Sequence, residues 1–104
     1  MRQLEVSQTP AQNFTVNIND FNFAITLRDI GGEILMDVSV NEKVLANGLP
    51  VLPNQPILPY EHLAKYGNFI LLTDSETYPT WETLGKESAL YYLTPEELEE
   101  LANG

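Results

Sequence analysis

The stretch NFTVNINDFNFAITLRDIGGEILMDVSV, residues 13–40, decides the fold of this chain. Apolar side chains recur at every second position within it, which is the period of a β-strand that buries one face. Within the expected strands, the intervening positions are polar apart from Ala24 and Leu35. The stretch therefore predicts a three-stranded antiparallel meander with a single apolar face. The inward positions are Phe14, Val16, Ile18, Phe21, Phe23, Ile25, Leu27, Ile34, Met36, Val38 and Val40.

Turn chemistry sets the expected pairing of these strands. A two-residue turn at residues 19–20 places Ile18 opposite Phe21. A four-residue turn over residues 29–32 pairs Arg28 with Glu33, so that opposite charges meet. A third turn over residues 41–43 leads into the apolar residues 44–46. A two-residue loop and a three-residue loop there place residues 44–46 on opposite faces of the sheet, and the sequence does not decide between the two loops.

Residues 47–60 contain a proline at about every third position, a density that a central strand does not tolerate. We expect an extended connection, partly of polyproline II type, that crosses the surface. Four aliphatic side chains between the prolines favour ordered packing over a disordered linker. They are Val51, Leu52, Ile57 and Leu58.

The remaining elements are short. We expect one helical turn at residues 60–64, a buried strand at 69–73, a polar loop at 74–85 and a last strand at 89–93. Thr94, Pro95 and Glu97 form a capping box that starts a helix, which requires docking through Leu98 and Leu101. The fold class is all-β: an antiparallel meander forming a small barrel or sandwich, with a β-domain at 1–93 and a short acidic C-terminal helix at 94–104.

Composition limits the function. At 104 residues the chain supports one core. Five basic against fifteen acidic residues give a net charge of -10, which argues against direct nucleic-acid binding and against docking on anionic membranes. Residues 1–93 retain a charge of -6, with eleven acids and five bases, so the acidity does not depend on the tail. We expect neither a transmembrane helix nor a secretory signal.

Residues suited to catalysis are scarce. There is no cysteine, and His62, the single histidine, is expected on the surface. No nucleophile elbow, calcium loop or phosphate-binding glycine loop is present, so we expect no enzyme, no cofactor and no metal site. Aromatic residues are the better candidates, because tyrosine and tryptophan are enriched at interfaces. The candidate contact residues are Tyr60, Tyr66, Tyr78 and Trp81.

The order of several short motifs is similar to that of a known family. An opening LEV at residues 4–6 is followed by PAQNFTVNI at 10–18, ANGLP at 46–50, GNFIL at 67–71 and LYY at 90–92. In this order the chain resembles the small phage baseplate plug proteins of cyanophage-type contractile tails. The similarity covers about residues 1–93 and leaves the acidic tail outside.

The resemblance implies a structural component of a phage or prophage-derived tail baseplate that plugs or bridges the central hub and tail tube. It implies contacts with hub, spike or tail-tube proteins, and several copies around the tail axis are one possible arrangement. It also implies that the protein is assembled in the host cytoplasm and ends up in the virion. An acidic surface in a tail channel repels DNA phosphate. The alternative is a small carbohydrate-binding β-module that uses Trp81 and neighbouring tyrosines.

Overall fold

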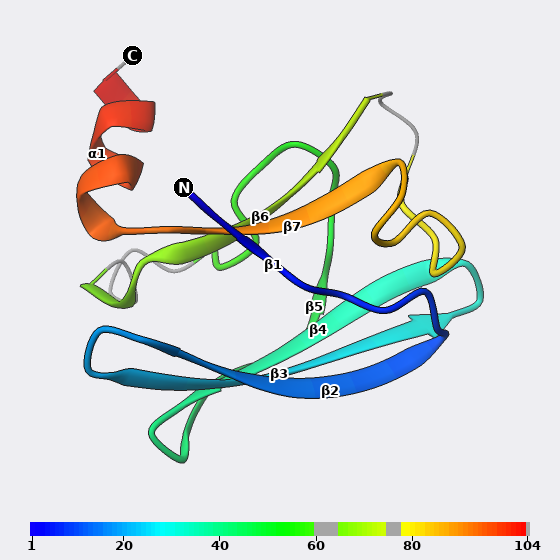
Figure 1. Cartoon of the computed structure of the whole chain (residues 1–104), viewed down its shortest axis with the longest axis horizontal. Helices are drawn as coiled ribbons and strands as arrows, with labels where there is room; N and C mark the ends of the chain where they lie inside the picture. The colour runs from blue at the N-terminus through cyan, green and yellow to red at the C-terminus, as the bar shows by residue number, and fades with distance from the viewer. Residues whose placement is uncertain (60–64, 75–77, 104) are drawn as a thin grey trace.

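The computed structural model describes residues 1–59, 65–74 and 78–103, and it consists mainly of two antiparallel sheets packed face to face (Figure 1). One sheet has the strand order β2-β3-β4-β5 and the other β1-β7-β6. Within the described ranges no ladder joins the two sheets, so the fold is a sandwich and not a closed barrel. The elements are β1 (Arg2–Leu4), β2 (Ala11–Ile18), β3 (Phe21–Ile30), β4 (Glu33–Val40), β5 (Lys43–Pro50), β6 (Asn68–Thr73), β7 (Ser88–Leu93) and α1 (Pro95–Asn103).

The predicted meander is confirmed, with one correction to its register. Ile18 pairs with Phe21, as the turn chemistry requires. In contrast, the β3–β4 ladder is shifted by two residues, so that Glu33 pairs with Ile30 and not with Arg28. Gly31 and Gly32 both have positive φ, at 63° and 89°, which allows a two-residue turn where four residues were expected. A shift of two preserves the side-chain alternation, and the predicted apolar face remains inward.

The fourth strand of this sheet runs further than the sequence suggested. Asn41 and Glu42 form a two-residue turn with positive φ, and β5 then continues through the expected proline-rich connection as far as Pro50. A bulge near Gly48 makes this possible. The Asp37 carboxylate accepts a hydrogen bond from the Gly48 amide at 2.6 Å and one from Arg28 at 2.9 Å. Because β5 is an edge strand, its terminal proline costs no interior ladder bond.

The proline-rich crossing leads from the end of β5 to the outer edge of β6, so it closes one side of the sandwich. Its backbone amides at Val51, Asn54 and Ile57 donate to carbonyl oxygens of β4 and β6 at 2.8–2.9 Å. The buried Asn68 side chain accepts from the Leu58 amide at 2.8 Å and donates to the Leu58 carbonyl at 2.9 Å. Val51, Ile57 and Leu58 are buried and Leu52 is half-buried, which confirms the ordered packing predicted for this segment.

The core lies between the sheets and is centred on three aromatic rings. Phe23 of β3 packs edge to face on Phe69 of β6 with 5.4 Å between ring centroids, and both rings contact Tyr92 of β7 at 5.6 Å. Such aromatic pairs contribute about 0.5–1.5 kcal/mol each beyond their buried area. Of the adjacent tyrosines in β7, Tyr92 is buried and Tyr91 is half-exposed, as the alternation of side chains along a strand requires.

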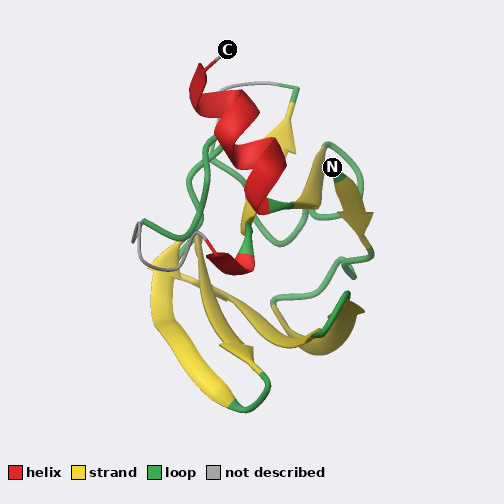
Figure 2. Cartoon of the chain, turned by 90° about the vertical axis from the view of Figure 1, so that its left-hand side faces the viewer, coloured by secondary structure: helices red, strands yellow, loops and turns green. Residues whose placement is uncertain are grey.

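The C-terminal helix begins as predicted. The Glu97 carboxylate accepts from the Thr94 amide at 2.9 Å, and the Thr94 hydroxyl accepts from the Glu97 amide at 3.2 Å. The helix lies on the side of the three-stranded sheet (Figure 2). Docking through both leucines was wrong, because Leu101 is 54% exposed and only Leu98 is half-buried. An ion pair between the Met1 amino group and Glu97 supplies a second attachment. The described helix is too short to cross a membrane.

Candidate functional site

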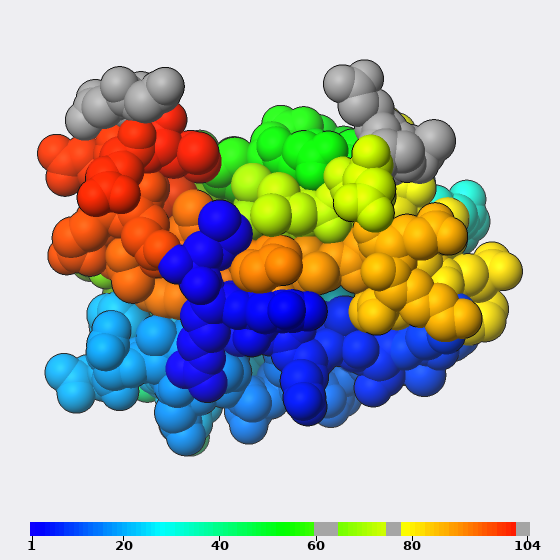
Figure 3. Space-filling view, turned by 45° about the horizontal axis from the view of Figure 1, so that its top comes forward, coloured from blue at the N-terminus to red at the C-terminus, as the bar shows by residue number. Residues whose placement is uncertain are grey.

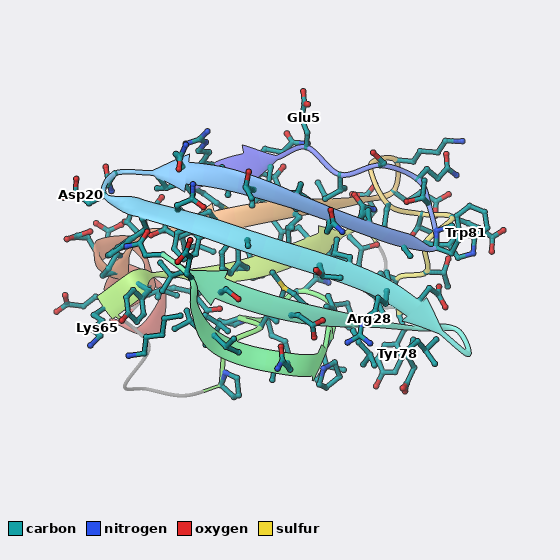
Figure 4. All side chains as sticks on the ribbon, turned by 90° about the horizontal axis from the view of Figure 1, so that it is seen from below. Glu5, Asp20, Arg28, Lys65, Tyr78 and Trp81 are labelled. Carbon is teal, nitrogen blue, oxygen red and sulfur yellow. The ribbon has the colours of Figure 1, made fainter. Side chains whose placement is uncertain are left out.

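The aromatic residues singled out from the sequence do not form one surface. Tyr60, like His62 and the helical turn expected at residues 60–64, lies outside the described residues. Tyr66 packs on Phe21 with 5.3 Å between ring centroids, next to the β2–β3 turn. Tyr78 and Trp81 lie at the opposite end of the molecule (Figure 4). The structure therefore separates Tyr66 from the other two described candidates.

Trp81 and Tyr78 differ in exposure. Trp81 is half-buried against the core, and its backbone amide donates to the Asp29 carboxylate at 3.0 Å. Asp29 also accepts from the Gly32 amide at 3.0 Å, so one carboxylate joins the β3–β4 turn to the loop that carries Trp81. Tyr78 is 63% exposed beside a small apolar notch formed with Pro50. Tyr78 alone of this pair offers most of its ring to a partner.

A more extended site lies on the side of the sandwich that the proline-rich crossing leaves open. There β1 and β2, the edge strands of the two sheets, lie side by side at the surface (Figure 3). Two adjoining grooves of about 400 and 440 Å³ run between them. Both grooves are lined by residues 3–5 from the β1 side and by Phe14 from β2. Phe14 and Val16 are half-buried there, so their apolar side chains are only partly covered.

The backbone of β2 presents free hydrogen-bonding groups to this opening. In an antiparallel pair, the N–H and C=O groups of alternate residues point toward and away from the partner strand. The Pro10 carbonyl accepts from the Asp29 amide at 2.8 Å, so the even-numbered residues of this segment face β3. Asn13, Thr15 and Asn17 consequently direct their backbone groups outward, and Arg2 donates to the Asn17 carbonyl at 3.4 Å.

Side-chain contacts close the two ends of the opening. The Gln12 amide group accepts from the Ser7 amide at 2.8 Å and donates to the Ser7 carbonyl at 2.6 Å. The Arg2 contact with Asn17 lies toward the other end. Between them, the outward backbone groups of Asn13 and Thr15 form no hydrogen bond to another described residue. This leaves a window of unpaired strand edge above a partly apolar floor.

Charge is distributed unevenly around the window. The strand β2, AQNFTVNI, contains no charged residue. Glu5 is exposed, lines both grooves and projects away from the body (Figure 4). Across the described residues there are two ion pairs, Met1 with Glu97 and Arg28 with Asp37, and neither involves Glu5. Most acidic side chains among the described residues therefore have no ion-pair partner.

This site was not predicted, because β1 cannot be recognised in the sequence. A three-residue strand is too short to show alternation, and Arg2, Gln3 and Leu4 pair with Tyr92, Tyr91 and Leu90 only through tertiary structure. The signal that was available is the absence of charge from residues 11–18 in a chain rich in acids. The site offers backbone donors, backbone acceptors and apolar surface, which is the chemistry of protein–protein contact. In residues 1–59, 65–74 and 78–103 no group of metal-ligating side chains gathers.

Comparison with known families agrees with a binding role. The model of the family described as "Cyanophage baseplate Pam3 plug gp18" matches residues 1–96. The match covers the whole sandwich and reaches into the first turn of α1, slightly beyond the resemblance seen in the sequence motifs. No curated protein matches the chain. The chain thus belongs to the cyanophage baseplate plug family.

Proposed function

We propose that this protein sits at the centre of a phage or prophage-derived tail baseplate and plugs or bridges the hub and the tail tube through protein–protein contacts. The observation that carries the proposal is the family match over residues 1–96, which spans both sheets. The open strand edge and its grooves support it, since they provide a surface for contact. No substrate or cofactor is needed for this role.

Surface charge supports a place next to the DNA path. Arg28 is the one basic side chain that forms an ion pair among the described residues, and the acids outnumber the bases by ten. A surface of this kind repels DNA phosphates, so the genome does not adhere to the plug before or during ejection. Retention of the protein on immobilised duplex DNA at physiological salt would contradict this part of the proposal.

Co-expression tests the assignment directly. The tagged chain is produced together with the hub, spike and tail-tube proteins encoded in the same genome, and the complexes are purified through the tag. We expect at least one of the three to co-purify at a fixed stoichiometry that survives gel filtration. A lysozyme of similar size with the same tag controls for adhesion to the resin. If none of the three proteins is retained, the proposed function is wrong.

A further inference from the structure

We propose that the window between β1 and β2 receives an extended strand of a neighbouring baseplate protein, which pairs with the free edge of β2 and places a basic side chain opposite Glu5. The inference rests on the proposed function and names the surface and the partner chemistry through which it acts. In this arrangement the docked segment adds a strand to the four-stranded sheet, which is the mode called β-augmentation.

The edge of β2 lacks the features that normally prevent strand pairing. Exposed edges are usually protected by lysine, proline, bulges or shortness. The edge strand β5 starts at Lys43, has a bulge and ends at Pro50. The outer edge of β6 is covered by the proline-rich crossing, and β1 has three residues. By comparison β2 is eight residues long, with neither charge nor proline.

The exposed backbone groups define where the strand binds. Asn13 and Thr15 each direct one N–H and one C=O into the window, in the spacing that an adjacent strand requires. The contacts of Gln12 with Ser7 and of Arg2 with Asn17 lie on either side of this pair. A segment that pairs with both residues is therefore guided to one position along β2.

The groove floor selects the side chains of the incoming strand. Successive side chains of a strand point to opposite faces, so every second side chain of the docked segment enters the grooves. There it meets the half-buried rings and aliphatic groups of Phe14, Val16 and Val6. Apolar residues at alternate positions fit this floor, because they bury surface that β2 leaves partly exposed.

Charge distinguishes another protein from a second copy of this chain. Glu5 borders both grooves without an ion-pair partner among the described residues, and Arg2, which lines one of the grooves, already contacts Asn17. A second copy carries the same net charge of -10 and brings no surplus of bases to offset Glu5. A partner strand with lysine or arginine opposite Glu5 gains an attraction that two acidic copies lack.

Two substitutions at one residue test the pairing. Thr15→Pro removes the outward N–H and puts the proline ring in its place at the strand edge. Proline is tolerated in the backbone of an edge strand, so β2 itself can still form. Thr15→Val keeps the N–H and a β-branched side chain, so it is the matched control. In the co-purification with hub, spike and tail-tube proteins, we expect Thr15→Val to behave as the wild type and Thr15→Pro to lose at least tenfold of the bound partner. Undiminished binding by Thr15→Pro overturns the inference and leaves the proposed function intact.

Hydrogen exchange gives an answer that does not depend on any variant. In the free protein we expect the Asn13 and Thr15 amides to exchange rapidly. In the purified complex we expect both amides to be protected, whereas the amide of Tyr78 should exchange as it does in the free protein. Rapid exchange of both amides in the complex overturns the inference. A wild-type chain that binds none of the three proteins overturns the proposed function, and with it the inference.

The charge component is tested separately. We expect Glu5→Lys to weaken partner binding about tenfold at low salt, and Glu87→Lys, the same charge change at an exposed residue outside the two grooves, to have little effect. Equal effects of the two substitutions contradict a specific role of Glu5.

Sedimentation of the chain alone tests whether a second copy of the chain occupies the window instead. A wild-type dimer that Thr15→Pro converts to a monomer shows that a second copy fills the window, and overturns the assignment to a baseplate partner.

Discussion

Replacing Asn68 with alanine tests whether one buried amide holds the proline-rich crossing against β6. The side chain is 7% exposed and makes three hydrogen bonds, accepting from the Leu58 and Phe69 amides at 2.8 and 2.7 Å and donating to the Leu58 carbonyl at 2.9 Å. Alanine leaves these three backbone groups buried without a partner. Each such group costs about 1–3 kcal/mol, so for the three groups together we expect the free energy of unfolding to fall by about 3–9 kcal/mol. This is a large part of the 5–15 kcal/mol typical of a domain.

The assay for Asn68→Ala is urea unfolding followed by circular dichroism and by the fluorescence of Trp81, the single tryptophan. Gln55→Ala serves as the control, because Gln55 belongs to the same crossing but is exposed, and such changes stay within about 0.5 kcal/mol. We also expect the Leu58 amide to exchange faster in Asn68→Ala. A loss below about 1 kcal/mol, or an unchanged Leu58 amide, would refute the conclusion that Asn68 anchors the crossing.

Three further predictions concern the core and the aromatic loop. Burial, and to a lesser extent the charge of Glu96, raises the pKa of the Tyr92 hydroxyl above its ordinary 10.0. The stability of the fold is therefore retained below pH 10 and is lost as the pH rises through the raised pKa. In alkaline urea titrations, the free energy of unfolding of Tyr92→Phe should fall less steeply with pH than that of the wild type. Gly67→Ala should lower the melting temperature far more than Gly48→Ala; both residues have positive φ, but only at Gly67 does a Cβ collide with neighbouring backbone, and similar losses would contradict the packing. Trp81→Ala should destabilise the fold by about 1–3 kcal/mol whereas Tyr78→Ala should not; a stable Trp81→Ala that loses glycan binding would instead support a carbohydrate-binding module.

Periodicity predicted the meander because each of its strands alternates over several residues. The face shared by Phe23, Ile25 and Leu27 is fully buried, and Ile18 opposite Phe21 follows from the turn. The capping box at Thr94 was equally local, since its two hydrogen bonds join residues three apart. Features that depend on neighbours in sequence were therefore predictable.

Features that alternation leaves open, or that depend on residues distant in the sequence, were not. The two-residue turn at Gly31 and Gly32 and the four-residue alternative give the same face, so alternation does not distinguish them. The continuation of β5 to Pro50 depends on the Asp37 carboxylate, which satisfies the Gly48 amide from a neighbouring strand. The candidate site could not be predicted either, because it lies between β1 and β2. The strand β1 is defined by its pairing with β7, at the other end of the sequence.

Because the proline-rich crossing covers one side of the sandwich, a partner strand can pair with the molecule at a single sheet edge. Residues 54–58 occupy the outer edge of β6, and the bulge and Pro50 interrupt that of β5. Among the described strands, β2 is therefore the one long edge left open to regular backbone pairing. A subunit with two pairing edges can be joined on both sides and so propagates into a fibre. A subunit with a single pairing edge ends the assembly that it joins. A terminating subunit suits an assembly of fixed size, in which each piece is added once and growth then stops.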